Sequence, residues 1–230
     1  MSLRSGPPSA SIAPLAGLVL CLALWPSTTH AQYIGIKGGL SVANVNVTGR
    51  PHLPAELQWC CSPWDGTRLD PAVGVMAGVT IRPSIELTME TLLTQRGFSI
   101  DRTDADPGSQ LRMSYIELAV LGHVVERRIR MFAGPSLGLN HTTRMLSQDP
   151  TRVLDYLDRS SLSRFDIGLV VGAGVDVNRL MVDVRYVHWF RNVLRHAPSG
   201  ASLRHKTFIL MFGVRVAGDS PRGSGVLPQT

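Results

Sequence analysis

Acidic and histidine side chains are the residues of this 230-residue chain that could do chemistry. Glu86 and Glu90 are four residues apart and could form an acid/base dyad, in which one carboxyl group donates a proton and the other accepts one. Candidates for a nucleophile and its base are His141, Ser147 and Asp149 in one expected loop, and His188, His196 and His205 around the next long loop. A triad needs its base within hydrogen-bond reach of a nucleophile, and no recognisable nucleophile motif surrounds these residues. We therefore predict no catalytic, cofactor-binding or metal site, and no enzyme.

The segment from Phe165 to Asn192 indicates which kind of element positions such side chains. On one parity it carries Ile167, Leu169, Val171, Ala173, Val175 and Val177, and on the other Asp166, Gly168, Gly172, Gly174 and Asp176. Successive side chains of a strand point to opposite faces, so this alternation is typical of a strand. Asn178-Arg179 interrupts it, and alternation resumes from Leu180 to Tyr186. The segment predicts a β-hairpin with one apolar face and one face of glycine and charge.

Alternation of the same period predicts six further strands: Tyr33–Val42, Val73–Ile81, Ile85–Phe98, Leu111–Val125, Met131–Asn140 and Thr207–Val216. Between the eight strands, long connections of roughly 12 to 30 residues alternate with short ones of about two to five, as in membrane barrels. We expect a turn at Glu126–Arg130, a bulge at Pro135, a helical turn at Val153–Leu157 and a basic loop at Val193–Lys206. The fold class is all-β: an eight-stranded antiparallel up-and-down transmembrane β-barrel.

Most charged residues of the predicted strands share the parity that the apolar residues avoid. They are Lys37, Arg82, Glu86, Glu90, Arg96, Glu117, Asp166, Asp176, Asp183, Arg185 and Arg215. A soluble barrel such as a lipocalin would turn its apolar face inward, whereas here the apolar face must be the outer one. Ionised groups in a narrow lumen are tolerated when they are paired. We therefore interpret Glu86 and Glu90 as members of a structural ion-pair network that plugs the lumen, with glycines giving the long side chains room.

The N-terminal residues predict export. Arg4 precedes an apolar run of about thirteen residues, too short for the roughly 20 of a spanning helix, and small residues precede a cut after Ala31. This is typical of a signal peptide at 1–31, followed by the barrel at 32–216 and a disordered tail at 217–230. The predicted location is the bacterial outer membrane.

Charge and cysteine content limit the partners. A formal net charge of +6 could indicate nucleic acid, but an exported chain rarely meets it, so we expect anionic lipid and no nucleic acid. Cys60 and Cys61 are adjacent and could form a strained disulfide, pair separately or stay reduced. Two cysteines fall short of a metal site, and a structural or incidental role is favoured over a redox role.

Several short motifs resemble one family of barrels. They are Ile34-Gly35-Ile36-Lys37-Gly38-Gly39-Leu40, Glu86 with Gln95-Arg96-Gly97-Phe98, Tyr115-Ile116-Glu117-Leu118, Phe132-Ala133-Gly134-Pro135, Asp166-Ile167-Gly168 with Gly172-Ala173-Gly174, and Asp183-Val184-Arg185-Tyr186. In this order they resemble the PorT-like outer-membrane β-barrel family and, more loosely, the OmpA/OmpX-type small barrels. The resemblance implies the barrel-insertion machinery as a partner. Such barrels usually end on an aromatic residue, for which Phe212 or an internal strand would have to serve here.

The predicted function is an integral outer-membrane barrel, a monomer with a structural or surface-interaction role. The alternatives are an outer-membrane lipid-modifying enzyme and a soluble exported barrel that carries a ligand. Aromatic side chains favour the membrane interface, so Phe98, Trp189 and Phe190 are expected at the outer rim. A basic cluster is expected to meet anionic headgroups of outer-membrane lipid, including lipopolysaccharide; it comprises Arg191, Arg195, Arg204, His205 and Lys206.

Overall fold

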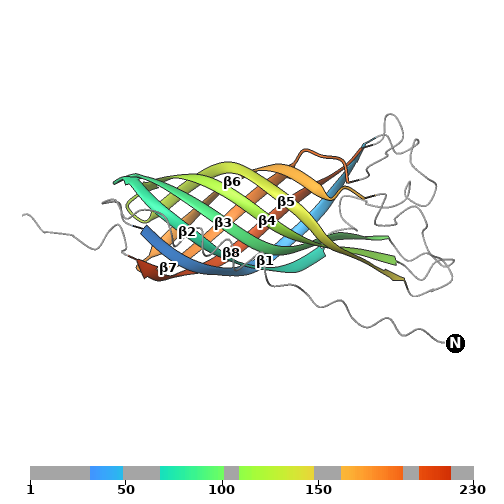
Figure 1. The fold of residues 1–230 in the computed structure, drawn as a ribbon, viewed down its shortest axis with the longest axis horizontal. Helices are drawn as coiled ribbons and strands as arrows, with labels where there is room; N and C mark the ends of the chain where they lie inside the picture. Colours follow the sequence, from blue (N-terminus) through green and yellow to red (C-terminus); the bar gives the residue numbers. More distant parts are fainter. Residues whose placement is uncertain (1–31, 49–67, 101–108, 148–161, 194–201, 219–230) are drawn as a thin grey trace, which may run out of the picture. The chain divides into compact units, whose positions relative to one another are not determined.

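The computed structural model describes residues 32–48, 68–100, 109–147, 162–193 and 202–218. These residues form eight strands: β1 (Gln32–Thr48), β2 (Arg68–Arg82), β3 (Ile85–Ile100), β4 (Ser109–Glu126), β5 (Ile129–Ser147), β6 (Phe165–Val177), β7 (Leu180–Trp189) and β8 (Ser202–Gly218). Each strand pairs antiparallel with the next, and β1 pairs with β8 to close the barrel (Figure 1). The predicted fold class is confirmed. No helix among the described residues is long and apolar enough to cross a bilayer.

Two-residue turns make three of the connections; all three fall in the predicted range of about two to five residues, and Asn178-Arg179 has its predicted bounds. The turns are Pro83-Ser84, Arg127-Arg128 and Asn178-Arg179. Arg127 and Asn178 have positive φ values of 53° and 56°, which suits the tight turns whose twist matches that of a hairpin. We call this end of the barrel the turn end and the opposite end the loop end. The connection after β3 spans only 101–108, so it is shorter than predicted.

The alternation of buried and exposed side chains follows the predicted parity. Ile36, Val184 and Phe212 face outward and are more than half exposed, whereas Lys37, Asp183 and Arg185 face inward and are at most 4% exposed. An apolar outer wall around a polar interior is the arrangement of barrels in lipid. Large inward rings lie against glycines of neighbouring strands: a Cβ at Gly78, Gly172 or Gly168 would collide with Tyr33, Phe132 or Trp189.

Several local predictions are wrong. Arg82 is exposed instead of inward, because it is the last residue before a turn and the register of β2 against β3 shifts between Thr80 and Arg82. The predicted bulge at Pro135 is also absent: Pro135 pairs with Leu169 of β6, and the offset between β4 and β5 is the same at Ala119/Ser136 and Gly122/Ala133. The register shift between β4 and β5 lies at Ser114/Tyr115.

Strand ends also differ from the prediction. Arg130 belongs to β5 and faces inward instead of standing in a turn, and β8 begins at Ser202, so part of the expected basic loop is strand. The signal peptide at 1–31, the tail beyond Gly218, Cys60, Cys61 and the helical turn at Val153–Leu157 lie outside the described residues.

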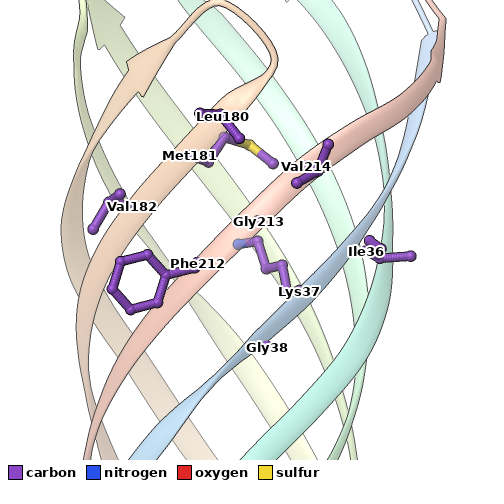
Figure 2. A pocket seen from close by; sticks show the side chains of 9 residues that line it. All are labelled: Ile36, Lys37, Gly38, Leu180, Met181, Val182, Phe212, Gly213 and Val214. Carbon is purple, nitrogen blue, oxygen red and sulfur yellow. The ribbon is translucent and has the colours of Figure 1, made fainter.

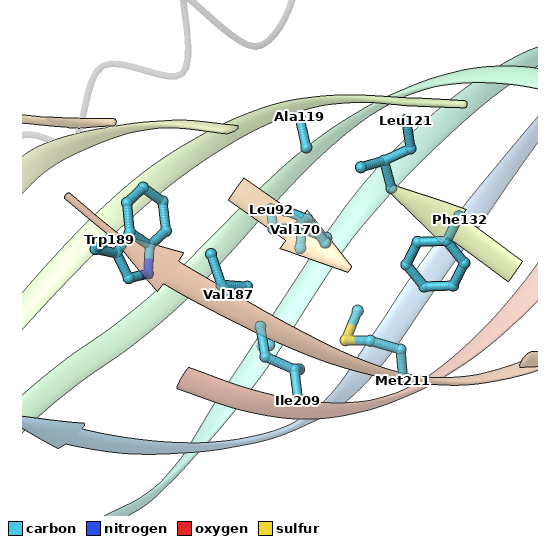
Figure 3. Close-up of a cluster of buried hydrophobic side chains, with 10 residues drawn as sticks. Leu92, Ala119, Leu121, Phe132, Val170, Val187, Trp189, Ile209 and Met211 are labelled. Atoms are coloured by element: carbon cyan, nitrogen blue, oxygen red, sulfur yellow. The ribbon is translucent and has the colours of Figure 1, made fainter. Parts of the chain in front are cut away.

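Apolar side chains fill the middle of the lumen. Figure 3 shows them converging from several strands; they are Ala72, Leu92, Ala119, Leu121, Phe132, Val170, Val187, Trp189, Ile209 and Met211. We call this set the apolar plug. Along β3, Leu92 separates Glu90 from Arg96, so the plug lies between two groups of inward charges.

Candidate functional site: the charged lumen

Eight buried charged residues occupy the half of the lumen nearest the turns. They are Lys37, Glu86, Glu90, Arg130, Asp176, Asp183, Arg185 and Arg215, each at most 6% exposed. We call them the turn-side network. Its four carboxylates match its four cations, so its formal charge is zero. Alternation delivers these side chains to one space, because each stands on the inward parity of its strand.

Glu90, Asp183, Lys37 and Arg185 form the centre of the network. Lys37 Nζ lies 2.6 Å from Glu90 Oε1 and 2.9 Å from Asp183 Oδ2. Arg185 donates from Nη1 to Glu90 Oε2 at 2.6 Å and from Nη2 to Asp183 Oδ1 at 2.7 Å. Each carboxylate therefore accepts from two cations, the short charge-assisted bonding that compensates for removal from water.

Arg130 and Arg215 extend the network towards the turns. Arg215 Nη2 lies 2.8 Å from Asp176 Oδ2 and 3.9 Å from Glu86 Oε2. Arg130 Nη2 lies 3.3 Å from Asp176 Oδ1 and 3.7 Å from Asp183 Oδ2, which connects this part to the centre. Every carboxylate of the network thus has at least one cation within 4 Å.

A second charged group lies towards the loop end. The Arg96 guanidinium bonds to Glu117, with Nε 3.1 Å from Oε1, and its Nη1 lies 3.6 Å from Asp166 Oδ2. It is stacked between two rings, 4.2 Å from the centroid of Tyr115 and 3.6 Å from that of Trp189. A guanidinium over aromatic faces gains cation–π attraction, which grows when the site is dry.

Trp189 and His205 both contradict the sequence predictions. Trp189 is fully buried in the lumen instead of lying at the outer rim, because the strand pleat continues to the last residue of β7. His205 is also fully buried, on the inward parity of β8, and its ring lies 6.4 Å from that of Tyr115. It cannot belong to a lipid-facing basic cluster. Phe190 is exposed, whereas the side chain of Phe98 lies outside the described set.

Several polar atoms in the loop-side half have no hydrogen-bond partner among the described protein atoms. They are Trp189 Nε1, both ring nitrogens of His205, Thr207 Oγ1 and Ser136 Oγ. Buried groups of this kind need partners, and ordered water is the usual one in a polar interior. Atoms without a hydrogen-bond partner also occur in the turn-side half, at Arg130 Nε, Arg215 Nε and His123 Nδ1, so protein atoms alone do not fully satisfy either half of the described lumen.

The catalytic candidates are not brought together. Glu86 receives a hydrogen bond from Tyr33 and lies near Arg215, whereas Glu90 is paired with Lys37 and Arg185, so the two do not share a proton as a dyad would.

The histidine candidates are separated as well. His188 lies on the outward face, with Nδ1 3.3 Å from the Tyr186 hydroxyl, while His205 is inside. His141 is exposed beside Thr142. Ser147 ends β5, and its side chain, Asp149 and His196 lie outside the described atoms. Among the described residues, no group of three or more His, Cys, Asp or Glu is arranged to hold a metal ion.

Known sequences show where this barrel belongs. The chain matches the family described as "Outer membrane protein beta-barrel domain" over residues 29–195, well over half of its length. The chain belongs to this outer-membrane β-barrel family. It is therefore an outer-membrane protein, and the soluble alternative is wrong. A search of curated proteins found no significant match.

Solved structures of other small outer-membrane proteins are similar to this outer-membrane barrel. Neisserial surface protein A shares 10% identity at a TM-score of 0.47, with 79% of this chain and 96% of that chain covered. Ail of Yersinia pestis, solved with the heparin analogue sucrose octasulfate, shares 10% identity at 0.44, with 81% and 99% covered. OprG from Pseudomonas aeruginosa shares 9% identity at 0.43, with 80% and 96% covered.

Sequence reasoning missed several lumen residues. Arg130 and His123 face inward next to the expected turn, and Tyr115 and Trp189 enclose Arg96. The parity of each strand, continued to the strand ends, would have identified all four. The sequence carries no comparable signal for which inward charges form ion pairs with one another.

Proposed function

We propose that this outer-membrane barrel is closed to solute flow and has a structural or surface-interaction role. The observation that carries the proposal is the turn-side network, in which Lys37 and Arg185 bridge Glu90 of β3 and Asp183 of β7. An eight-stranded barrel has an interior that side chains just fill. The apolar plug adds a second layer above the network.

A passing ion would have to break this network. The central contacts between oppositely charged side chains are 2.6 to 2.9 Å long, and separating such partners in a buried site leaves uncompensated charges. The neutral total charge also offers no net attraction to either sign of ion. Both features favour a plugged lumen over a selective channel.

Planar-bilayer conductance tests this proposal. Purified wild-type protein is expected to give no steady current. The Glu90→Gly/Arg185→Gly variant removes a matched pair of charges from the centre and leaves the apolar plug in place, so a current that appears in this variant alone would show that the network is the layer that excludes ions. A heat-modifiable band on an unboiled gel would show that the variant folds. Steady, large, ion-selective currents from the wild type would contradict a closed lumen.

Basic side chains on the outer surface indicate which lipids this barrel contacts. We propose that Arg191, Arg204 and Lys206, which face outward at the loop end, contact anionic headgroups of outer-membrane lipid such as lipopolysaccharide. Arg195 of the predicted cluster lies outside the described residues, and His205 is excluded by its burial. We also propose that the protein is related more closely to PorT-like barrels, that it is a monomer, and that the barrel-insertion machinery inserts it into the outer membrane.

The proposal does not include an enzymatic activity. His188 and His205 point to opposite sides of the barrel wall, and no observation favours a lipid-modifying reaction at the described residues.

A further inference from the structure

The outer wall carries an apolar groove of about 330 Å³ over β7, β8 and β1 (Figure 2). Strand register explains its position. Two rows of outward residues border it: Leu180, Val214 and Ile36 in the first, and Val182, Phe212 and Gly38 in the second. The row between them, centred on Gly213, faces the lumen. The floor of the groove is therefore the strand backbone.

Gly38 leaves one side of the groove open. A Cβ built at Gly38 would find no atom within 4 Å, so no neighbouring side chain covers this position. Ile36, Leu180 and Phe212 around it are 54 to 56% exposed. Because this wall faces hydrocarbon in an outer-membrane barrel, a flexible acyl chain can occupy the depression and bury apolar surface that the protein itself leaves uncovered.

Arg179 stands at the turn-end limit of the same groove. It directly precedes Leu180, its side chain is exposed, and its carbonyl oxygen accepts a hydrogen bond from the backbone of Arg215 at 2.9 Å. The turn is thus tied to β8, and the Arg179 side chain starts from a fixed backbone position. Arg179 is adjacent in sequence to Leu180, which lines the groove, and a guanidinium and an apolar groove are suited to the two parts of a lipid, a phosphate and a hydrocarbon chain.

Charge at the turn end favours an anionic partner. The exposed side chains of the short turns and their flanks include Arg82, Arg127, Arg128 and Arg179, while Glu126 is the one exposed carboxylate among the residues whose side chains are described. Short turns of such barrels face the periplasm. The lipid nearest this end is therefore one of the periplasmic leaflet.

We propose that the groove and Arg179 form a seat for one anionic phospholipid of the periplasmic leaflet. Its acyl chain lies between the two outward rows, and its phosphate is held by Arg179. The proposal depends on the membrane location of the barrel but not on whether the lumen is closed.

Tryptophan fluorescence with brominated lipid tests the seat. Phe212→Trp places a probe in the groove, and Phe208→Trp places one on the same strand outside it; both native phenylalanines are 56% exposed. Each variant is reconstituted into phosphatidylcholine vesicles that contain a minor fraction of phosphatidylglycerol with dibrominated acyl chains, and the wild-type signal is subtracted. Quenching is expected to be stronger at 212 than at 208.

Two further substitutions test the groove and the phosphate-binding side chain independently. Gly38→Leu should fill the open side and abolish the excess quenching at 212. Arg179→Gln should lower the preference for phosphatidylglycerol over dibrominated phosphatidylcholine about fivefold, which corresponds to about 1 kcal/mol for one cation at an anionic surface. Heat-modifiable mobility of each variant confirms folding.

Two outcomes would overturn the proposal. Equal quenching at 212 and 208 would mean that the groove holds no preferred lipid. Protection of position 212 from lipid, together with cross-linking between copies of the chain, would mean that a second barrel covers it instead.

Discussion

At the scale of single residues, most described carboxylates of this barrel lie buried in the lumen, whereas many of its cations are exposed on the outer surface. Among the residues whose side chains are described, seven carboxylates are buried: Asp70, Glu86, Glu90, Glu117, Asp166, Asp176 and Asp183. Outward cations cluster at the two ends instead, as at Arg179 and Arg204. Inside, an arginine or Lys37 lies within 4 Å of each of the following carboxylates, which compensates for their removal from water: Glu86, Glu90, Glu117, Asp166, Asp176 and Asp183. Outside, long basic side chains can extend along the wall to the headgroups.

Removal of Arg185 should expose how strongly the centre of the network depends on pairing. Arg185→Ala leaves Glu90 and Asp183 with one cation fewer in a site that is at most 2% exposed. Breaking a buried pair in this way costs about 3–5 kcal/mol. Urea-induced unfolding in lipid vesicles measures this change in stability.

Matched variants give the control for Arg185. Arg128→Ala, in an exposed turn, should change stability little. Adding Glu90→Gln to Arg185→Ala removes one of the orphaned charges and should recover part of the loss. Equal destabilisation by Arg185→Ala and Arg128→Ala would contradict a paired lumen.

The loss of folding stability caused by an arginine substitution on the outer wall should depend on how deep that position lies in the bilayer. Val184 and Val124 are outward and similarly exposed, at 54% and 56%, but Val184 is near mid-strand and Val124 is beside a turn. Val184→Arg should cost about 2–4 kcal/mol and Val124→Arg about 0–1 kcal/mol, because the penalty is largest at the midplane. Folding equilibria in vesicles measure both. Indistinguishable penalties would mean that Val184 does not lie in the hydrocarbon core.

At the level of elements, the pairing of β1 with β8 closes the barrel, and the inward face of this pairing leaves no room for a side chain at Gly39. Gly38 and Gly39 are neighbours on β1 that face opposite sides. A Cβ at Gly39 would collide with the backbone of Leu210 and Met211 on β8, whereas one at Gly38 would meet nothing within 4 Å. Backbone atoms in a ladder cannot move aside as a flexible side chain can.

Gly39→Ala is therefore expected to destabilise the barrel by about 1–3 kcal/mol, the usual cost of overpacking, while Gly38→Ala stays close to wild type. The loss of the folded band on unboiled gels with rising urea measures both variants. A normal midpoint for Gly39→Ala would show that the pairing of β1 with β8 relaxes more easily than its geometry indicates.

Across the whole barrel, a charge-balanced turn-side network and an apolar plug fill the interior, and the exposed charged side chains described at its two ends are mostly basic. Proteins meet anionic lipid through such side chains, and each cation near the surface contributes about 1 kcal/mol. Arg191, Arg204 and Lys206 are the described outward cations nearest the β7–β8 connection. The loop end and the turn end would then contact the two leaflets separately.

Neutralising Arg191, Arg204 and Lys206 to Gln should weaken binding of detergent-solubilised protein to mixed micelles that contain a phosphate-bearing lipid. It should also reduce the salt sensitivity of that binding, because surface attraction is screened by ions. His205→Gln is the control, since this side chain is buried in the lumen. Unchanged affinity and salt dependence in the triple variant would contradict a lipid-binding outer rim.

The period of two along each strand was enough to predict the barrel and most of its lumen residues. Side-chain direction alternates because of local backbone geometry, so Lys37, Glu90, Asp183 and Arg185 could be assigned inward without a structure. At Trp189 the prediction did not follow this alternation, because the preference of aromatic rings for the membrane interface favoured a position at the outer rim. The pleat prevailed, and Arg96 provides the cation on which the buried ring stacks.

Tertiary structure alone decided which charges meet. Lys37 bonds Glu90, 53 residues away, and Asp183, 146 residues away; parity places all three inside but does not determine their height in the lumen. That height depends on the stagger between strands and on the closure of β1 against β8. Both are properties of the closed sheet as a whole, because each strand's register is set by its neighbours. The apolar groove over Gly213 arises in the same way, from three strands that are far apart in the sequence and adjacent only in the folded barrel.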